Sequence, residues 1–280
     1  MTTSDDRVLV VGAAGPNAGL VVPELVRRGA LVRGLVRHEN QTEAVRSRGA
    51  HEVVVGDLTD RDSVREALDG VSRAFYIAPA FIPDEAEIGR AFVTDAVESG
   101  VRRIVFSSVI HPVLADLVNH AAKAPVEEAI LNTGIEFTFL HPVLFFQMLE
   151  GSIPAAAESG TLAEPWSAET RFSRVDYRDV AEVAAHALLE DDLLWGTLDL
   201  AAPGQLNRHE VASLIADASG RDVKATRIDP DRLDVPAPMR AMFDHYDHTG
   251  LVASPLTLRA ALGREPRSLL DYIDETLDQH

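Results

Sequence analysis

The chain has 280 residues, 46% of them hydrophobic and 25% charged, which is typical of a globular protein with a sizeable core. Its net charge of −18 repels phosphate backbones and anionic bilayers, and no basic run offsets it, so we expect neither nucleic acid nor membrane partners. The absence of cysteine excludes disulfides, thiolate metal sites and cysteine nucleophiles. Residues 1–6 are polar, unlike a signal peptide, and no long apolar segment follows, so we expect a cytoplasmic protein.

Apolar strands and helices alternate through the first half of the chain. The expected strands are 8–11, one ending at 37, 51–55, 74–77, 103–106 and 136–140. The expected helices are one ending at 28, then 41–48, 62–68, 85–98, 120–132 and 269–277. Such alternation requires parallel strands joined by right-handed helical crossovers, a doubly wound α/β sheet.

The second half is broken by prolines and glycines and is less regular. We expect a nucleotide-binding domain over residues 1–150 and a smaller α/β substrate-binding part over 151–280. A segment near 170–200 is expected to return to the main domain. Ligands of doubly wound sheets bind beyond the carboxyl ends of the strands, so the functional residues are sought there.

The first strand runs into Gly12-Ala13-Ala14-Gly15-Pro16-Asn17-Ala18 and then into a helix. A helix start directs backbone N–H groups and a positive dipole end at one spot, which suits a dinucleotide pyrophosphate. Counting back from Gly29, the pattern is Gly-x-x-Gly-x-x-Ala, which keeps close helix-to-strand packing possible. A tight turn without a ligand is the alternative. The cofactor contacts expected here are Gly12, Ala14, Gly15, Pro16, Asn17 and Ala18.

Further motifs follow in order along the chain. They are Gly56-Asp57-Leu58, Val105-Phe106-Ser107-Ser108, Lys123 with Val126-Glu127, the 134–142 strand, Val175-Asp176-Tyr177-Arg178-Asp179-Val180-Ala181, Gly250-Leu251-Val252 and Leu262-Gly263-Arg264. Together with the glycine turn they resemble the NmrA-like branch of the atypical short-chain dehydrogenases. The resemblance implies a Rossmann fold, a small C-terminal substrate domain and a nicotinamide dinucleotide. It leaves the reaction open, because the family includes reductases of quinones, dyes and phenolic ethers as well as redox sensors.

Arg37 ends the second strand, where an NAD-preferring site usually has Asp or Glu. A guanidinium can pair with a 2′-phosphate, so NADP(H) is preferred as the cofactor. NAD(H) stays possible through Glu39, and a solvated surface arginine is the alternative for Arg37. Asp57 is expected at the adenine edge, unless it is only a turn residue. The other strand-end contacts expected for the cofactor are Leu58, Ala78, Pro79, Ser107, Lys123, Pro142 and Val143.

Short-chain dehydrogenases usually carry a Ser and a Tyr-x-x-x-Lys motif, in which the Tyr transfers the proton. The resemblance places Ser107 beside the nicotinamide and gives Lys123 the lysine position, but Asn119 stands where Tyr is expected. An amide is not a proton donor at neutral pH. Lys123 then binds the ribose, donates the proton itself or is a plain surface lysine. His120 would share a helix face with Lys123 and could shuttle the proton, or only cap or pack.

The substrate pocket is expected to include Ser108, His111, Phe145, Phe146 and Tyr246, although small strand-end residues and aromatic runs often only pack. No metal site is expected. The function predicted is an NADPH-dependent oxidoreductase that reduces a small apolar carbonyl, quinone or conjugated substrate. Because the Tyr is missing, two alternatives stay open. One is a non-catalytic NADP(H)-binding redox sensor or partner-binding protein, and the other is a non-redox isomerase or cyclase. The oligomeric state is not predicted.

Overall fold

The computed structural model describes residues 7–79, 81–82 and 84–279, so the polar start at 1–6 lies outside the described residues. The chain divides into two compact units. The first unit comprises residues up to 113, 119–141 and 180–198, and the second comprises 114–118, 142–179 and 199–280. The expected boundary at residue 150 lies a short way beyond the observed break after 141.

A seven-stranded sheet forms the centre of the first unit, in the order β10-β6-β5-β4-β1-β2-β3. Its strands are β1 (Arg7–Val11), β2 (Leu31–Val36), β3 (Glu52–Val55), β4 (Arg73–Ile77), β5 (Arg103–Ser107), β6 (Glu136–Pro142) and β10 (Gly196–Leu200). Strands β1 to β6 pair in parallel. This order confirms the predicted Rossmann fold. Because β1 lies between β2 and β4, the direction of winding reverses between β1 and β4, where ligands bind in such sheets.

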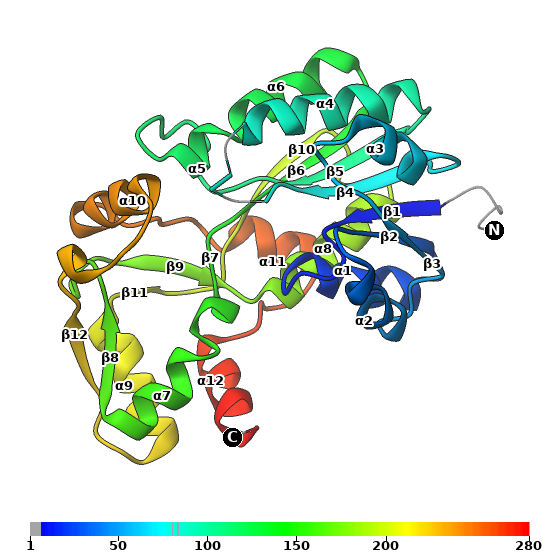
Figure 1. The fold of residues 1–280 in the computed structure, drawn as a ribbon. Coiled ribbons are helices and arrows are strands. Elements are labelled where there is room, and N and C mark those ends of the chain that lie inside the picture. The colour runs from blue at the N-terminus through cyan, green and yellow to red at the C-terminus, as the bar shows by residue number, and fades with distance from the viewer. Residues whose placement is uncertain (1–6, 80, 83, 280) are drawn as a thin grey trace. The chain divides into compact units, whose positions relative to one another are not determined.

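Helices cover both faces of this sheet, with α3, α4 and α6 on one side and α1 and α2 on the other (Figure 1). Their bounds are α1 (Ala18–Arg27), α2 (Thr42–Ser47), α3 (Arg61–Leu68), α4 (Glu85–Glu98) and α6 (Ala124–Thr133). Under α4, the ring of Tyr76 stacks on Phe92 with 4.4 Å between centroids and lies 5.5 Å from Phe106. All three are fully buried, so this face of the core is built from aromatic packing on apolar strands.

The single helix predicted over 120–132 is wrong, because the chain forms two helices there. A short helix, α5 (Val118–Ala121), ends before Lys123, and α6 starts at Ala124 with Pro125 in its first turn. Proline has no N–H, and its ring would clash with the carbonyl four residues earlier in a continuous helix. His120 and Lys123 therefore do not share one helix face.

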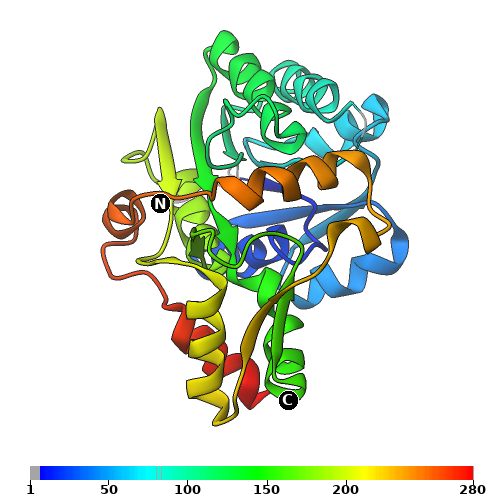
Figure 2. The same ribbon diagram turned by 90° about the vertical axis from the view of Figure 1, so that its left-hand side faces the viewer.

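The second unit holds a three-stranded sheet in the order β11-β9-β7 and a two-stranded parallel sheet of β12 and β8. Helices α7, α9 and α12 lie beside one another around the core of this unit (Figure 2). The strands are β7 (Leu144–Phe145), β8 (Thr161–Glu164), β9 (Phe172–Val175), β11 (Gln205–Leu206) and β12 (Lys224–Arg227). The helices are α7 (Ser152–Ser159), α9 (Arg208–Ser219), α10 (Ala237–His248), α11 (Leu256–Leu262) and α12 (Leu269–Asp278), and α8 (Tyr177–Leu189) runs from this unit into the first. Among the helices described, none is long and apolar enough to cross a membrane.

Candidate cofactor and active site

The turn after β1 has the backbone geometry of an anion-binding loop. Gly12 leaves the strand with a φ of 69°, which glycine adopts without a side-chain clash. The N–H of Gly15 donates to the Gly12 carbonyl at 2.8 Å and closes the turn. Helix α1 begins at Ala18, and the Asn17 side chain makes no capping bond to it. Asn17 therefore leaves the positive end of α1 without a side-chain cap, and this end suits an anionic ligand.

Close packing at Ala18 agrees with the spacing counted in the sequence. A Cβ placed on Gly12 would lie 3.9 Å from the Ala18 methyl, and Ala18 is buried. Arg48 was not predicted as a site residue. Its Nη1 donates to the Ala13 carbonyl at 2.6 Å and so stabilises the turn. No local signal could have identified Arg48, since it follows α2 and reaches the turn only through the tertiary fold.

Arg37 and Asp57 lie together after two neighbouring parallel strands. Arg37 follows β2, Asp57 follows β3, and Arg37 Nη2 lies 3.4 Å from Asp57 Oδ2. The backbone N–H and hydroxyl of Thr59 donate to Asp57, and with Arg37 they lower the pKa of this carboxyl. The Arg37 side chain is 70% exposed and so available to a ligand. The Arg33 guanidinium is not available to a ligand, because it donates hydrogen bonds to Glu52 and to two backbone carbonyls.

The ends of β4 and β5 continue the same edge of the sheet. Ala78 and Pro79 follow β4, the first buried and the second exposed, while Ser107 is the buried last residue of β5 and pairs with Ile77. Leu58, after β3, packs against the core of the first unit. Because β1, β4 and β5 are neighbours, Ala78, Pro79 and Ser107 lie on the edge that also carries the glycine turn.

Lys123 is held in a buried ion pair. Its Nζ donates to Glu85 Oε1 and to the Asn119 carbonyl at 3.2 Å, and the Lys123 and Glu85 side chains are only 7% and 4% exposed. Glu85 is the first residue of α4, eight residues beyond the end of β4, and it was missed because no motif in the sequence singles it out. Lys123 is thus neither a surface lysine nor a free cation in this structure.

Asn119 stands where the resemblance predicts a tyrosine, and His120 is its neighbour in the chain. Asn119 Oδ1 is buried without a hydrogen-bond partner among the described residues. His120 is 1% exposed, and burial lowers its pKa to about 4, against smaller opposing effects of hydrogen bonds to the His111 and Ile110 carbonyls. His120 is therefore neutral near pH 7 and carries no acidic imidazolium. His111, with a φ of 52°, is half-buried in the loop after β5.

Ser108 belongs to a buried polar cluster. Its hydroxyl donates to Glu127 Oε1 at 2.5 Å, and His141 Nε2 lies 2.8 Å from the same oxygen. Ser108 and His141 are 6% and 7% exposed. Ser108 was expected to line the substrate pocket, but the structure turns its hydroxyl to Glu127. The sequence placed Glu127 in a family motif without a role; here it joins the ends of β5 and β6.

The remaining predicted residues lie in the second unit. Pro142 and Val143 are buried, and Phe145 is half-buried with its ring 4.8 Å from that of Tyr177. Phe146 is 1% exposed and belongs to the core of this unit.

Tyr246 is 3% exposed and packs against Trp166 and Phe172, with centroids 5.4 and 5.0 Å away. Phe146 and Tyr246 were expected in the substrate pocket. Both side chains are buried among core residues in this structure, and their place in a substrate pocket stays a prediction. Among the residues that the structure describes, no group of three His, Asp or Glu side chains could hold a metal ion.

The fold and the glycine turn define a Rossmann-type α/β protein. The sequence model of the NmrA-like family matches residues 4–254, and the chain belongs to this family. The resemblance seen in the sequence is thereby confirmed.

Several relatives of this chain are reductases. It is 29% identical over 230 residues to the NAD(P)H azoreductase of Xenophilus azovorans, covering 79% of this chain and 77% of that protein. It is 22% identical over 218 residues to quinone oxidoreductase 2 of Escherichia coli, covering 77% of this chain and 76% of that one.

Solved structures share the fold over nearly the whole chain. The Citrobacter sp. triphenylmethane reductase complexed with NADP(H) has a TM-score of 0.84 at 23% identity and covers 97% of this chain and 99% of that one. The Escherichia coli NADPH-dependent quinone oxidoreductase complexed with NADPH has a TM-score of 0.84 at 20% identity and covers 96% and 99%.

Proposed function

We propose that this chain is an NADP(H)-dependent oxidoreductase that reduces a small, largely apolar carbonyl, quinone or conjugated substrate. The observation that carries the proposal is the juxtaposition of the glycine turn at the start of α1 with Arg37 at the end of β2. The turn suits a pyrophosphate, and the exposed guanidinium suits a 2′-phosphate. The NAD(P)H azoreductase and the quinone oxidoreductases among its relatives support the same cofactor and the same general reaction.

The first unit would supply a distinct contact for each part of the dinucleotide. Backbone N–H groups of the Gly12–Ala18 turn would hold the pyrophosphate, and Arg37 and Asp57 would flank the adenosine. The Arg37–Asp57 ion pair is long and half-exposed, so it can rearrange around a phosphate at little expense. Ala78, Pro79 and Ser107 would then border the nicotinamide.

The bound nicotinamide would supply a hydride, and the chain would have to manage the accompanying proton. Asn119 cannot donate one, and His120 is neutral near pH 7. Lys123 is the remaining charged group, but it is committed to Glu85. Water or Lys123 would therefore protonate the product. Quinones and enones need a weaker acid than simple ketones, which favours them as substrates.

The same observations favour a second candidate, a non-catalytic NADP(H)-binding sensor. An amide at the tyrosine position and a lysine locked in an ion pair would leave a cofactor site without an acid. In this case the dinucleotide would bind in both redox states without turnover.

The test combines cofactor titration with a turnover panel. Calorimetry should show binding of NADPH tighter than that of NADH. Absorbance at the reduced-nicotinamide band should then fall when a naphthoquinone, an azo dye or an enone is added. Tight binding of NADP⁺ and NADPH without consumption on this panel would support the sensor instead. Failure to bind either dinucleotide would overturn both candidates.

A further inference from the structure

Two arginines are buried in the second unit, and one of them has a counter-ion and an acceptor for each of its three nitrogens. Arg208, the first residue of α9, is 3% exposed. Its Nε donates to Glu164 at 3.0 Å, its Nη1 to the Thr226 carbonyl at 2.7 Å and its Nη2 to the Trp166 carbonyl at 2.8 Å. The carboxylate of Glu164 therefore serves as the counter-ion of Arg208.

The other arginine, Arg174 on β9, is not satisfied in this way. It is 7% exposed, and its hydrogen bond is a long one, 3.4 Å from Nη1 to the Leu206 carbonyl. The Phe172 ring lies 5.7 Å from the guanidinium carbon. Within the described part of the chain, no carboxylate is in ion-pair distance of Arg174. Most of its five N–H donors thus have no protein acceptor.

The charges around Arg174 do not cancel. The Glu164 carboxylate pairs with Arg208 and also attracts Arg174 from a greater distance. One negative charge cannot neutralise two guanidiniums, so one positive charge is left uncompensated. Burial lowers the pKa of Arg174, but a guanidinium stays protonated in proteins. Water can satisfy its donors but cannot neutralise its charge, and an unpaired buried ion is strongly unfavourable.

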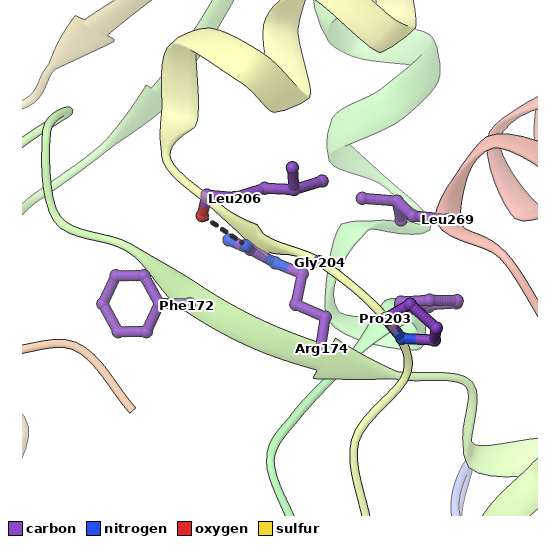
Figure 3. Close-up of a pocket in the computed structure, with 7 residues that line it drawn as sticks. Phe172, Arg174, Pro203, Gly204, Leu206 and Leu269 are labelled. Atoms are coloured by element: carbon purple, nitrogen blue, oxygen red, sulfur yellow. Dashed lines mark hydrogen bonds between the residues drawn. The ribbon is translucent and has the colours of Figure 1, made fainter. Parts of the chain in front are cut away.

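A cavity lies against the same side chain. Arg174 rises from β9 towards the segment that carries Gly204 and Leu206, with Phe172, Pro203 and Leu269 around it (Figure 3). The cavity measures about 10 Å³, which is room for one water-sized group. Gly204 has a φ of 103° and contributes no side chain to the wall.

We propose that Arg174 and this cavity form a binding site for a monovalent anion, either a halide or the carboxylate of a small organic acid. An anion would supply the missing negative charge and accept from the free N–H donors, while the apolar wall would strengthen the pairing by excluding water. The small cavity admits a single-atom ion or one end of a carboxylate and excludes larger oxyanions such as sulfate. The site stands independently of the proposed redox function, because it rests on residues of the second unit alone.

The test compares thermal stability in sodium chloride and sodium methanesulfonate at equal ionic strength, because the sulfonate group is as large as sulfate and should not fit the cavity. Chloride should raise the melting temperature of the wild-type protein saturably, by about 2–4 °C, because it binds only the folded state. Arg174→Gln should abolish the difference between the two salts. Arg171→Gln, which removes an exposed arginine paired with Glu210, should retain it. Equal responses to both salts in the wild type, or an unchanged chloride effect in Arg174→Gln, would overturn the proposal.

A crystal of the wild-type protein soaked in bromide provides a readout that needs no variant. Anomalous scattering should show a bromide beside the Arg174 guanidinium, and the absence of a peak there would overturn the proposal. Formate added with the bromide distinguishes the two kinds of ligand. Displacement of the peak assigns the site to carboxylates as well, and its retention assigns the site to halides.

Discussion

At the carboxyl edge of the sheet, the ion pairs and hydrogen bonds of the side chains are made with partners that are remote in sequence. Lys123 meets Glu85 across 38 residues, and Ser108 meets Glu127 across 19. Sequence reasoning named Lys123 and Ser108 as candidates from their positions but could not see these partners. Burial then decides the chemistry, because it fixes Lys123 in an ion pair and holds His120 neutral.

Arg37→Ala should weaken NADPH binding by about 10–100-fold, because one charge-assisted contact to the 2′-phosphate contributes roughly 1.5–3 kcal/mol. NADH binding should change little, since NADH lacks that phosphate. Isothermal titration calorimetry with both cofactors measures the two effects. Arg90→Ala, which removes an exposed arginine from α4, serves as the matched control. Equal weakening of NADPH and NADH by Arg37→Ala would refute the 2′-phosphate assignment.

Lys123→Met should lower the free energy of unfolding by about 3–5 kcal/mol, because it leaves the Glu85 carboxylate buried without a cation. Lys123→Met combined with Glu85→Leu should recover most of this loss, because neither charge then remains. Urea unfolding followed by circular dichroism measures both. A single variant as stable as the wild type would contradict the buried pair, and the stable double variant allows the role of Lys123 in cofactor binding to be measured separately.

Lowering the pH should lower the free energy of unfolding, and His120 should contribute to this loss. Burial lowers the pKa of His120 from 6.5 to about 4, so the unfolded state binds the proton more readily. The stabilising contribution is complete above pH 6.5 and is lost towards pH 4, at up to about 1.4 kcal/mol per pH unit. Urea unfolding at pH 7, 6 and 5 should show a steeper decline for the wild type than for His120→Asn. Parallel pH profiles would argue against a buried neutral imidazole.

Among the elements, the turn between β1 and α1 follows from its local sequence, whereas the region of α5 and α6 does not. The turn needs a glycine at positive φ and small residues at the helix start, both of which the sequence displays. The break between α5 and α6 was missed because helical periodicity continues through it, although Pro125 supplies the local signal.

A comparison of the variants Gly12→Ala and Gly100→Ala separates the effect of backbone strain on stability from the effect of the turn on cofactor binding. Both glycines have left-handed φ values, 69° and 82°, and none of the described residues comes closer than 3.7 Å to a Cβ at either position. Each substitution should therefore lower stability by about 1–2 kcal/mol. Only Gly12→Ala should also weaken NADP⁺ binding, by about tenfold or more, because its methyl group faces the pyrophosphate turn. Thermal unfolding and calorimetry measure the two effects, and similar cofactor affinities for both variants would exclude the turn as the binding loop.

For the whole molecule, the doubly wound parallel sheet was predictable, because strand and helix patterns alternate along the first half of the chain. The division into two units was harder, since the chain crosses between them several times and residues 180–198 return to the first unit. Such returns depend on long-range contacts that carry no periodic signal in the sequence.

NADP⁺ at about 100 times its dissociation constant should stabilise the folded chain by about 2.7 kcal/mol and raise the melting temperature by roughly 5 °C. The same concentration of NAD⁺ should produce a smaller rise. Differential scanning fluorimetry provides the measurement. Identical shifts with both nucleotides would argue against NADP(H) preference, and no shift with either would argue against a dinucleotide site.

The sequence by itself determined the alternating sheet, the glycine turn and the place of Arg37, because each depends on local periodicity, backbone conformation or residue type. The assignment of Asn119 to the usual tyrosine position rests on the resemblance to the family. Only the tertiary structure decided that Lys123 is paired with Glu85, that Ser108 is turned to Glu127 and that Phe146 and Tyr246 are core residues. It alone also placed Arg174 beside a cavity without a counter-ion. Burial and pairing arise when distant segments pack together, and they set the charge and the accessibility on which function depends.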